Sequence, residues 1–333
     1  MKNLTLFVTN KCNSKCIMCF NTRLNKKENE LSLGEYEKIS KHISDLDELF
    51  ISGGEPSLRQ DLDKICYYFY KNCVIKKIKL PMNGQLTNET VELAMNILNL
   101  CPNSELSITL ALDGLKEIHD KQRGVKGSFD KVIKTYNKLS NLAKKNKKLK
   151  IGFVTTVTKI NYHNLKELTD FTKKLSSQPL YHNLMACRMQ SSNVKNKLII
   201  SSEEFGDLLL FDQRLRKRMM KNNYSFFKRK LIEKFNPVLN NLYLNAYSGK
   251  KIINCRAVEN SRVIEANGDV RVCEMKQVIG NIRNSNYDLD KILISQKFKF
   301  MVKDCCCIHP CFVIPSLKSP LNLLRSIKSY FFG

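Results

Sequence analysis

The feature that most constrains the fold is a regular alternation of short β-rich runs with amphipathic helical stretches over the first 225 of the 333 residues. Six runs are predicted to be strands, at residues 4–9, 49–52, 75–80, 106–112, 151–157 and 180–186. The first helical stretch opens on a capping box, Ser32-Leu-Gly-Glu35. Strand–helix units repeated in this way predict parallel strands joined by right-handed crossovers. Six units fit either an open doubly wound sheet or a partial barrel.

In both α/β architectures the functional residues gather at the carboxyl ends of the strands. Polar residues, glycines and cysteines follow the six runs here, at residues 10–19, 53–56, 83–84, 113–114, 158–161 and 187–188. The sequence therefore predicts an active-site rim built from these segments.

The alternation stops after about residue 225. We expect Asn236-Pro237 to break the chain, because proline lacks a backbone N–H and disfavours a helical conformation of the residue before it. A second unit is expected to begin near Cys255, with a hairpin formed by residues 262–266 and 269–273 around Asn267-Gly268. Such a turn sequence is typical of hairpins whose two turn residues both have positive φ.

Composition excludes several classes of protein. Hydrophobic residues make up 43% and charged residues 26%, so a disordered, collagenous or coiled-coil chain is excluded. No apolar run reaches the roughly 18–20 residues that span a bilayer, and no signal peptide is recognisable, so we expect a cytoplasmic protein. The net charge of +25 favours anionic partners or substrates, although the positive charges do not form one block. No RNA-recognition motif is found, so nucleic acid is not an expected partner.

Thirteen cysteines in a chain without a secretion signal indicate metal or redox chemistry rather than disulfides. Cys12, Cys16 and Cys19 lie within eight residues on the loop after the first run. Three close thiolates suit a soft metal or an iron–sulfur cluster. A structural zinc ion normally takes four protein ligands, and no fourth cysteine or histidine lies nearby. Three ligands to a four-iron cluster would leave one iron open.

These cysteines, in their context, resemble the radical S-adenosylmethionine (SAM) superfamily, whose hallmark is this spacing after the first strand of a partial barrel. Phe20 stands where an aromatic residue commonly follows the third cysteine. The segment 53–56, Gly-Gly-Glu-Pro, is similar to the segment that holds the SAM amino group. Met82-Asn83-Gly84 stands where the family usually has Thr-Asn-Gly, so Met82 departs from the pattern. The segment 110–129 is similar to the fourth-strand region of the subgroup with auxiliary clusters.

The resemblance implies a partial (β/α)6 TIM-like barrel with a [4Fe–4S] cluster on Cys12, Cys16 and Cys19, which are the catalytic cysteines. It implies that SAM binds the open iron, and that reduction cleaves SAM to methionine and a 5′-deoxyadenosyl radical that abstracts hydrogen from a substrate. An external electron donor such as flavodoxin or ferredoxin is implied as well. The SAM-binding residues implied are Phe20, Gly53, Gly54, Glu55, Pro56, Asn83, Asp113 and Arg123. For Asp113, a helix cap and a substrate contact remain open.

The C-terminal cysteines resemble the SPASM and shorter "twitch" extensions of radical SAM enzymes, in which a cysteine on each side of a hairpin helps to bind an auxiliary cluster. The cysteines are fewer than in a full SPASM set, so the resemblance implies one auxiliary [4Fe–4S] cluster. Its expected ligands are Cys255, Cys273, Cys307 and Cys311, and Cys305 or Cys306 could replace one of them. A zinc knuckle that uses His309 is the alternative.

We therefore expect a barrel at 1–225, a linker or helical connection at 226–254, a cysteine-rich auxiliary-cluster domain at 255–311 and a basic amphipathic tail at 312–333. The tail either docks on its own domain or lies on a membrane surface, which would make the protein peripheral. The predicted activity is that of a radical SAM oxidoreductase acting on a peptide or protein, or on a sugar- or lipid-linked precursor. The alternatives are a bond-forming or isomerising radical SAM enzyme with a structural auxiliary cluster, and a non-catalytic iron–sulfur or zinc-binding protein.

Overall fold

The computed structural model describes residues 3–21, 23–26, 29–44, 46–175, 181–188, 196–223, 225–256, 259, 261–293, 307–309 and 316–332. The chain forms two compact units. Unit 1 comprises residues 1–199 and 261–295, and unit 2 comprises residues 200–260 and 296–333. The domain boundaries predicted from the sequence stay a prediction.

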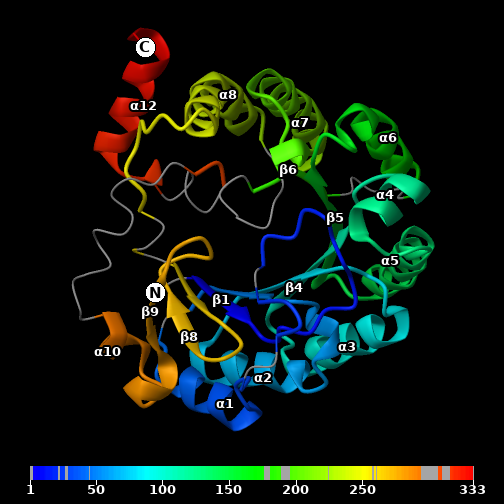
Figure 1. The fold of residues 1–333 in the computed structure, drawn as a ribbon, viewed down its shortest axis with the longest axis vertical. Coiled ribbons are helices and arrows are strands. Elements are labelled where there is room, and N and C mark those ends of the chain that lie inside the picture. Colours follow the sequence, from blue (N-terminus) through cyan, green and yellow to red (C-terminus); the bar gives the residue numbers. More distant parts are fainter. Residues whose placement is uncertain are drawn as a thin grey trace. The chain divides into compact units, whose positions relative to one another are not determined.

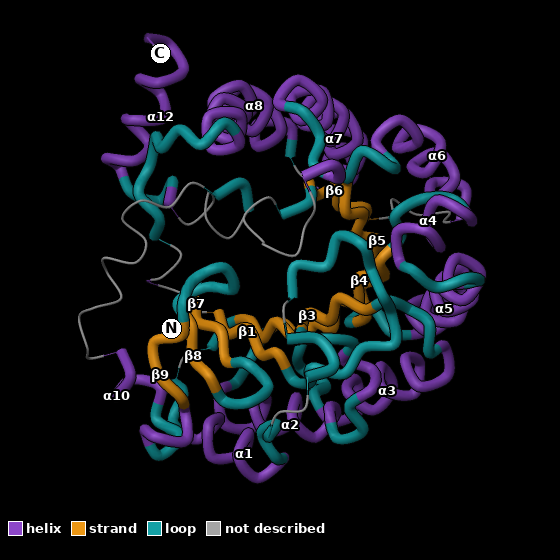
Figure 2. The backbone as a smooth tube through the Cα atoms, viewed as in Figure 1, coloured by secondary structure: helices purple, strands orange, loops and turns teal. Residues whose placement is uncertain are grey.

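Unit 1 is built on one sheet with the strand order β6-β5-β4-β3-β2-β1-β7-β8-β9 (Figure 2). The first six strands are parallel and lie in chain order, as a partial (β/α)6 barrel requires. They are β1 (Asn3–Phe7), β2 (Glu48–Ser52), β3 (Lys77–Met82), β4 (Glu105–Ala111), β5 (Leu149–Val157) and β6 (Tyr181–Ala186). The predicted fold class is confirmed.

The helices of unit 1 lie along the outside of this curved sheet (Figure 1). They are α1 (Leu33–Lys41), α2 (Leu62–Cys73), α3 (Thr87–Leu100), α4 (Lys116–Arg123), α5 (Ser128–Lys145), α6 (Leu165–Leu175) and the short α10 (Leu289–Leu293). Alternate strand residues such as Leu4, Ile51 and Ile108 are fully buried in one core with Tyr36 and Phe69 of the helices. The capping box forms as predicted: the Ser32 amide donates to Glu35 Oε2 at 2.8 Å, and Ser32 Oγ accepts from the Glu35 amide.

The predicted hairpin is present and extends the barrel sheet. Strand β7 (Ser261–Ile264) pairs in parallel with β1, and β8 (Asp269–Arg271) and β9 (Val278–Asn281) follow as antiparallel strands. The turn differs from the expected one, because only Gly268 has a positive φ, of 88°. The Gly268 amide donates to the Glu265 carbonyl at 2.9 Å, so the connection is a three-residue loop with a glycine in the left-handed region.

Unit 2 contains α7 (Ser202–Asn223), α8 (Phe226–Tyr247) and α12 (Pro320–Phe332). The expected chain break at Asn236-Pro237 is wrong, because Pro237 lies inside α8. Proline within a helix costs about 3 kcal/mol. Packing of the helix offsets this cost: Val238, Leu242 and Ala246 are buried just after the proline. Among the described helices, none is long and apolar enough to cross a membrane.

Candidate active site

The loop after β1 carries Cys12, Cys16 and Cys19 and rests on the last turn of α4. The amides of Lys15 and Ile17 donate to the carbonyls of Arg123 and Gln122, each at 3.1 Å. A side chain at position 124 would collide with the Lys15 carbonyl group, so Gly124, whose φ is 65°, permits this approach. The backbone of α4 therefore sets the path of the cysteine loop.

The three thiols are half-buried and influence one another. Burial raises the pKa of the Cys12 thiol to about 11, and nearby Cys16, Glu55 and Cys19 add to the rise. Burial and Cys16 likewise raise the pKa of Cys19. No three His, Cys, Asp or Glu side chains within the described ranges converge closely enough to hold a single metal ion. A four-iron cluster does not need such convergence, because each thiolate binds a different iron atom and becomes deprotonated on coordination.

Two glycines after β2 bring that strand against the cysteine loop. The Gly54 amide donates to the Thr9 carbonyl at 2.7 Å, and the Glu55 amide donates to the Lys11 carbonyl at 2.8 Å. Gly53 has a φ of 129°, which side chains rarely tolerate. A Cβ atom on Gly54 would lie 2.7 Å from the Lys11 carbonyl carbon. The two strand ends can touch only because both side chains are absent.

Glu55 is buried with an exposed fraction of 2%. Its Oε1 accepts from the Ser57 hydroxyl at 2.6 Å and the Ser57 amide at 3.2 Å, and its Oε2 accepts from the Asn83 amide at 2.8 Å. Burial raises the pKa of this carboxyl, and these hydrogen bonds oppose the rise. The three bonds use three of roughly four acceptor sites on a carboxylate, so one site remains for a donor. A cation there would favour the ionised form.

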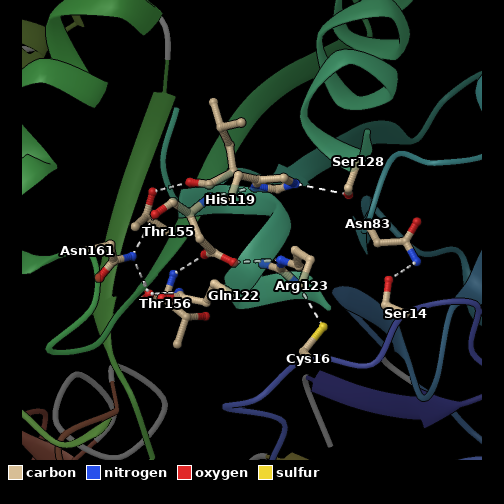
Figure 3. A network of polar contacts seen from close by, with 12 residues as sticks. Ser14, Cys16, Asn83, His119, Gln122, Arg123, Ser128, Thr155, Thr156 and Asn161 are labelled. Atoms are coloured by element: carbon tan, nitrogen blue, oxygen red, sulfur yellow. Dashed lines mark hydrogen bonds and ion pairs between the residues drawn. The ribbon is translucent and has the colours of Figure 1, made fainter. Parts of the chain in front are cut away.

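The segment after β3 connects the Glu55 carboxylate to the cysteine loop. The Asn83 side-chain amide donates to Asn13 Oδ1 at 2.6 Å and to Ser14 Oγ at 3.2 Å, both between the first two cysteines. Gln85 Nε2 donates to the same Ser14 hydroxyl at 2.5 Å. Ser14 and Asn83 face each other in Figure 3. The sequence pattern identified Asn83, but nothing in it indicated Gln85.

A largely buried ion pair joins the ends of β4 and α4. Arg123 Nε lies 2.6 Å from Asp113 Oδ2, and Arg123 Nη1 donates to Cys16 Sγ at 3.7 Å. Asp113 Oδ1 also accepts from the Thr156 amide at 2.8 Å. Burial raises the pKa of Asp113, and the Arg123 guanidinium opposes that rise. We take the pair as ionised, because a guanidinium stays protonated in proteins. A fixed positive charge therefore lies beside the Cys16 thiol.

His119 fixes the position of the Asp113 backbone. Its Nδ1 accepts from the Asp113 amide at 3.1 Å, so the proton sits on Nε2, which points to Ser128 Oγ at 3.1 Å. Burial lowers the pKa of His119 to about 3, so the ring is neutral at physiological pH. His119 and Ser128 therefore support the strand end.

Phe20 contacts Arg188, a residue of the predicted rim whose partners the sequence did not indicate. The Arg188 guanidinium, just after β6, stands 4.0 Å from the centre of the Phe20 ring and forms an ion pair with Glu274. Glu274 follows Cys273 directly, and Phe20 follows Cys19 directly. Arg188 therefore links the cysteine loop to the residue beside Cys273, within unit 1.

Comparison with known proteins identifies the family. A model of the radical SAM superfamily matches residues 6–172, which is half of the chain. The chain belongs to the radical SAM superfamily. As a radical SAM protein it has the predicted cofactors, a [4Fe–4S] cluster and SAM. The predicted resemblance to a radical SAM enzyme with a SPASM/twitch-type extension is confirmed. The individual site residues stay predictions.

Relatives of this radical SAM chain are known. Fe-coproporphyrin III synthase of Methanosarcina barkeri is 26% identical over 208 residues, which are 61% of this chain and 49% of that protein. The antilisterial bacteriocin subtilosin biosynthesis protein AlbA of Bacillus subtilis is 24% identical over 295 residues, 85% of this chain and 58% of that protein. The chain thus spans about half to three-fifths of the length of these relatives.

The solved structure of anSMEcpe with bound AdoMet and a Cp18Cys peptide has the same fold. Its TM-score is 0.60 at 20% identity, and the match covers 92% of this chain and 84% of that chain.

The residues of this radical SAM site fit their cofactors. The soft thiolates of Cys12, Cys16 and Cys19 are the donors that an iron–sulfur cluster takes. Glu55 has acceptor capacity for an ammonium group, and Arg123 presents a buried cation beside Cys16. Pro56 starts a 3-10 turn, Pro56–Leu58, capped by Glu55, which holds that carboxylate in place.

Only part of the expected auxiliary-cluster set can be placed. Cys255 and Cys307 both pack against the buried pair Leu242 and Ile253 in unit 2. Cys273 follows β8 in unit 1, where its carbonyl accepts from the Lys276 amide at 3.2 Å. Cys305, Cys306 and Cys311 lie outside the described residues. The predicted ligand set stays a prediction.

Proposed function

We propose that this radical SAM enzyme is an oxidoreductase that abstracts hydrogen from a peptide or protein substrate. One observation carries the proposal: the match to AlbA, a bacteriocin biosynthesis protein, covers 85% of the chain. A match of that length necessarily takes in α7, α8 and the hairpin strands β7 and β8. The porphyrin-synthase match covers only 61%. The solved structure with a bound peptide supports the same substrate class.

When bound, the cluster and SAM supply a 5′-deoxyadenosyl radical on one-electron reduction. In this proposal the chain's own residues position SAM. Glu55, with its carboxylate held by Ser57 and Asn83, would accept a hydrogen bond from the SAM ammonium at its remaining acceptor site. The Arg123 guanidinium, fixed by Asp113, places positive charge beside Cys16 and would be available to the carboxylate of SAM.

The proposal includes partners. An external one-electron donor such as flavodoxin or ferredoxin is needed, because SAM cleavage consumes an electron that this chain does not supply. The net charge of +25 favours association with an anionic donor and with an anionic substrate.

The test is an anaerobic reconstitution with iron and sulfide, followed by reduction with dithionite in the presence of SAM. The reaction is run with a pool of random short peptides, and separately with GTP or a nucleotide sugar. We expect 5′-deoxyadenosine, detected by mass spectrometry, to rise with the peptide pool. At least one peptide should lose the mass of two hydrogen atoms: one would pass to 5′-deoxyadenosine, and the other would leave as a proton and an electron that is returned to the electron donor, so that SAM is the net oxidant. A response to GTP or the nucleotide sugar alone would contradict the peptide assignment.

Cys12→Ala, Cys16→Ala and Cys19→Ala should each abolish 5′-deoxyadenosine, because each removes a ligand to the SAM-binding cluster. Cys66→Ala is the matched control, since Cys66 is buried in α2 and lies away from the loop. Turnover that survived any of the three loop substitutions would refute the site assignment.

A further inference from the structure

Helix α12 is packed on unit 2 through its polar side. Asn322 and Ser326 are buried, with exposed fractions of 2% and 0%. Asn322 Nδ2 donates to the carbonyls of Asn254 and Ser316, each at 3.0 Å. Near the other end, Ser329 Oγ accepts from Asn241 of α8 at 3.1 Å. Hydrogen bonds therefore hold α12 to its own unit.

The opposite side of α12 is apolar and exposed. Leu321, Leu324 and Phe331 have exposed fractions of 57%, 64% and 66%. At about 100° per residue, Leu324 and Phe331 lie close together around the helix and nearly opposite the arc of Asn322 and Ser326. The usual arrangement, with the apolar side packed inward, is thus reversed.

Cations lie within this apolar face and along one side of it. Lys318, Arg325 and Lys328 are exposed, and residues 316–332 contain no Asp or Glu. Lysine is depleted in the cores of protein–protein interfaces, so this mixture does not suit a dry protein contact. Apolar side chains flanked by cations are typical of helices that lie in the interface of an anionic membrane.

We propose that the outer face of α12 binds the surface of an anionic lipid bilayer, with the helix axis in the membrane plane. Leu321, Leu324 and Phe331 enter the boundary between head groups and acyl chains, and Arg325 and Lys328 contact lipid phosphates. At 13 residues, or about 20 Å, the helix is too short to cross a core of about 30 Å. This inference does not depend on the substrate of the enzyme.

The test is co-sedimentation of the full-length, reconstituted protein with vesicles. Vesicles of phosphatidylcholine are compared with vesicles in which about one-third of the lipid is phosphatidylglycerol, which gives the surface a negative charge. We expect binding to the anionic vesicles in about 0.1 M salt and release in about 1 M salt, because salt screens surface charge. Equal binding to both kinds of vesicle would overturn the proposal.

Two double substitutions separate the contribution of the cations to membrane binding from that of the apolar side chains. Arg325→Gln with Lys328→Gln should lower the partition coefficient about 25-fold, at about fivefold for each cation. Leu324→Ser with Phe331→Ser should lower it at least tenfold, since burial of apolar area on the membrane is lost. Both pairs are exposed, so folding should be retained, which circular dichroism and the melting temperature check.

The matched controls lie on unit 1. Lys131→Gln with Lys134→Gln removes the same charge from α5, and Met95→Ser removes an apolar side chain that is 47% exposed on α3. The partition coefficients of these controls should lie within about twofold of the wild-type value, which corresponds to a change of ~0.4 kcal/mol or less in the free energy of binding. A similar loss in controls and α12 variants would overturn the proposal. Self-association that the α12 variants abolish without lipid would overturn it too, since a second copy would then cover the face.

Discussion

Gly54→Ala should separate the strand end that carries Glu55 from the cysteine loop. An added Cβ atom would overlap the Lys11 carbonyl group, whose oxygen is the nearest atom and whose carbon lies at 2.7 Å, and it would lie 3.1 Å from the Asn10 carbonyl carbon. Both neighbours are backbone atoms, so neither can turn aside as a side chain would. Gly54 does not have a positive φ, so the effect of alanine comes from this contact and not from backbone strain.

The size of the effect follows from these distances. The Lys11 carbonyl oxygen is the nearest atom, so the carbonyl group must move by on the order of 1 Å to reach the 3.4 Å of ordinary contact. That movement weakens the bond from the Glu55 amide to the Lys11 carbonyl and shifts the residue next to Cys12. Overpacking of about 1–3 kcal/mol and a hydrogen bond of about 1 kcal/mol together lower the free energy of unfolding by about 2–4 kcal/mol. Displacement on this scale lowers catalytic rates about 100-fold.

The assay measures iron and sulfide content, 5′-deoxyadenosine formation and the melting temperature of the same samples. Gly34→Ala is the matched control, because Gly34 lies in α1 with no atom within 4 Å of an added Cβ. The control should keep its iron and activity and gain about 0.5–1 kcal/mol, since alanine favours helix. If Gly54→Ala kept wild-type iron content and wild-type SAM cleavage, the close approach of the two strand ends would not be what positions the loop.

Three further predictions concern the hairpin region. Arg283→Met should lower the free energy of unfolding by about 2 kcal/mol in urea titrations, because Arg283 Nε donates to Glu35 Oε1 at 2.6 Å and Nη1 donates to the carbonyls of Asn29 and Asn267; an unchanged midpoint would contradict this. The hydrogen bond from Arg283 lowers the pKa of Glu35 to about 2, below its unfolded value of about 4.3, so this stability is present above about pH 4.3 and is lost as the pH falls toward 2. Between pH 5 and pH 3 the melting temperature should therefore fall more steeply for the wild type than for Arg283→Met. Equal slopes would refute the assignment of this pH dependence to the Arg283–Glu35 pair. Cys273→Ala should remove about four of eight irons while SAM binding is retained, and unchanged iron would refute an auxiliary cluster at this cysteine.

Much of unit 1 could be predicted because its signals are local. Buried strand residues alternate with amphipathic helices, and the Ser32–Glu35 capping box depends only on neighbours in the chain. Helix α4 was not predicted, since its eight residues are mostly polar and bury only His119 and Gln122. The predicted chain break at Pro237 was wrong for the opposite reason, because tertiary packing of α8 overrides a strong local signal.

The site shows the same division between local and distant contacts. The motifs predicted Glu55, Asn83 and Asp113 as site residues, but not that the Asn83 amide donates to Glu55, that Asn83 donates to Ser14, or that the Thr156 amide donates to Asp113, because these contacts join different strand ends. Arg188 was placed on the predicted rim, but its partners Phe20 and Glu274 were not predicted, because they are far away in the sequence.

The parallel pairing of β7 with β1 has a consequence for biosynthesis. Asn3 lies opposite Ser261, so one edge of β1 stays unpaired until the ribosome has made β7, roughly 250 residues later. At about 5–20 residues per second, the nascent barrel exposes that edge for on the order of 10–50 s. Open strand edges recruit other chains, so we expect newly made barrel to need a chaperone, and expression of fragments that end before β7 to yield aggregates.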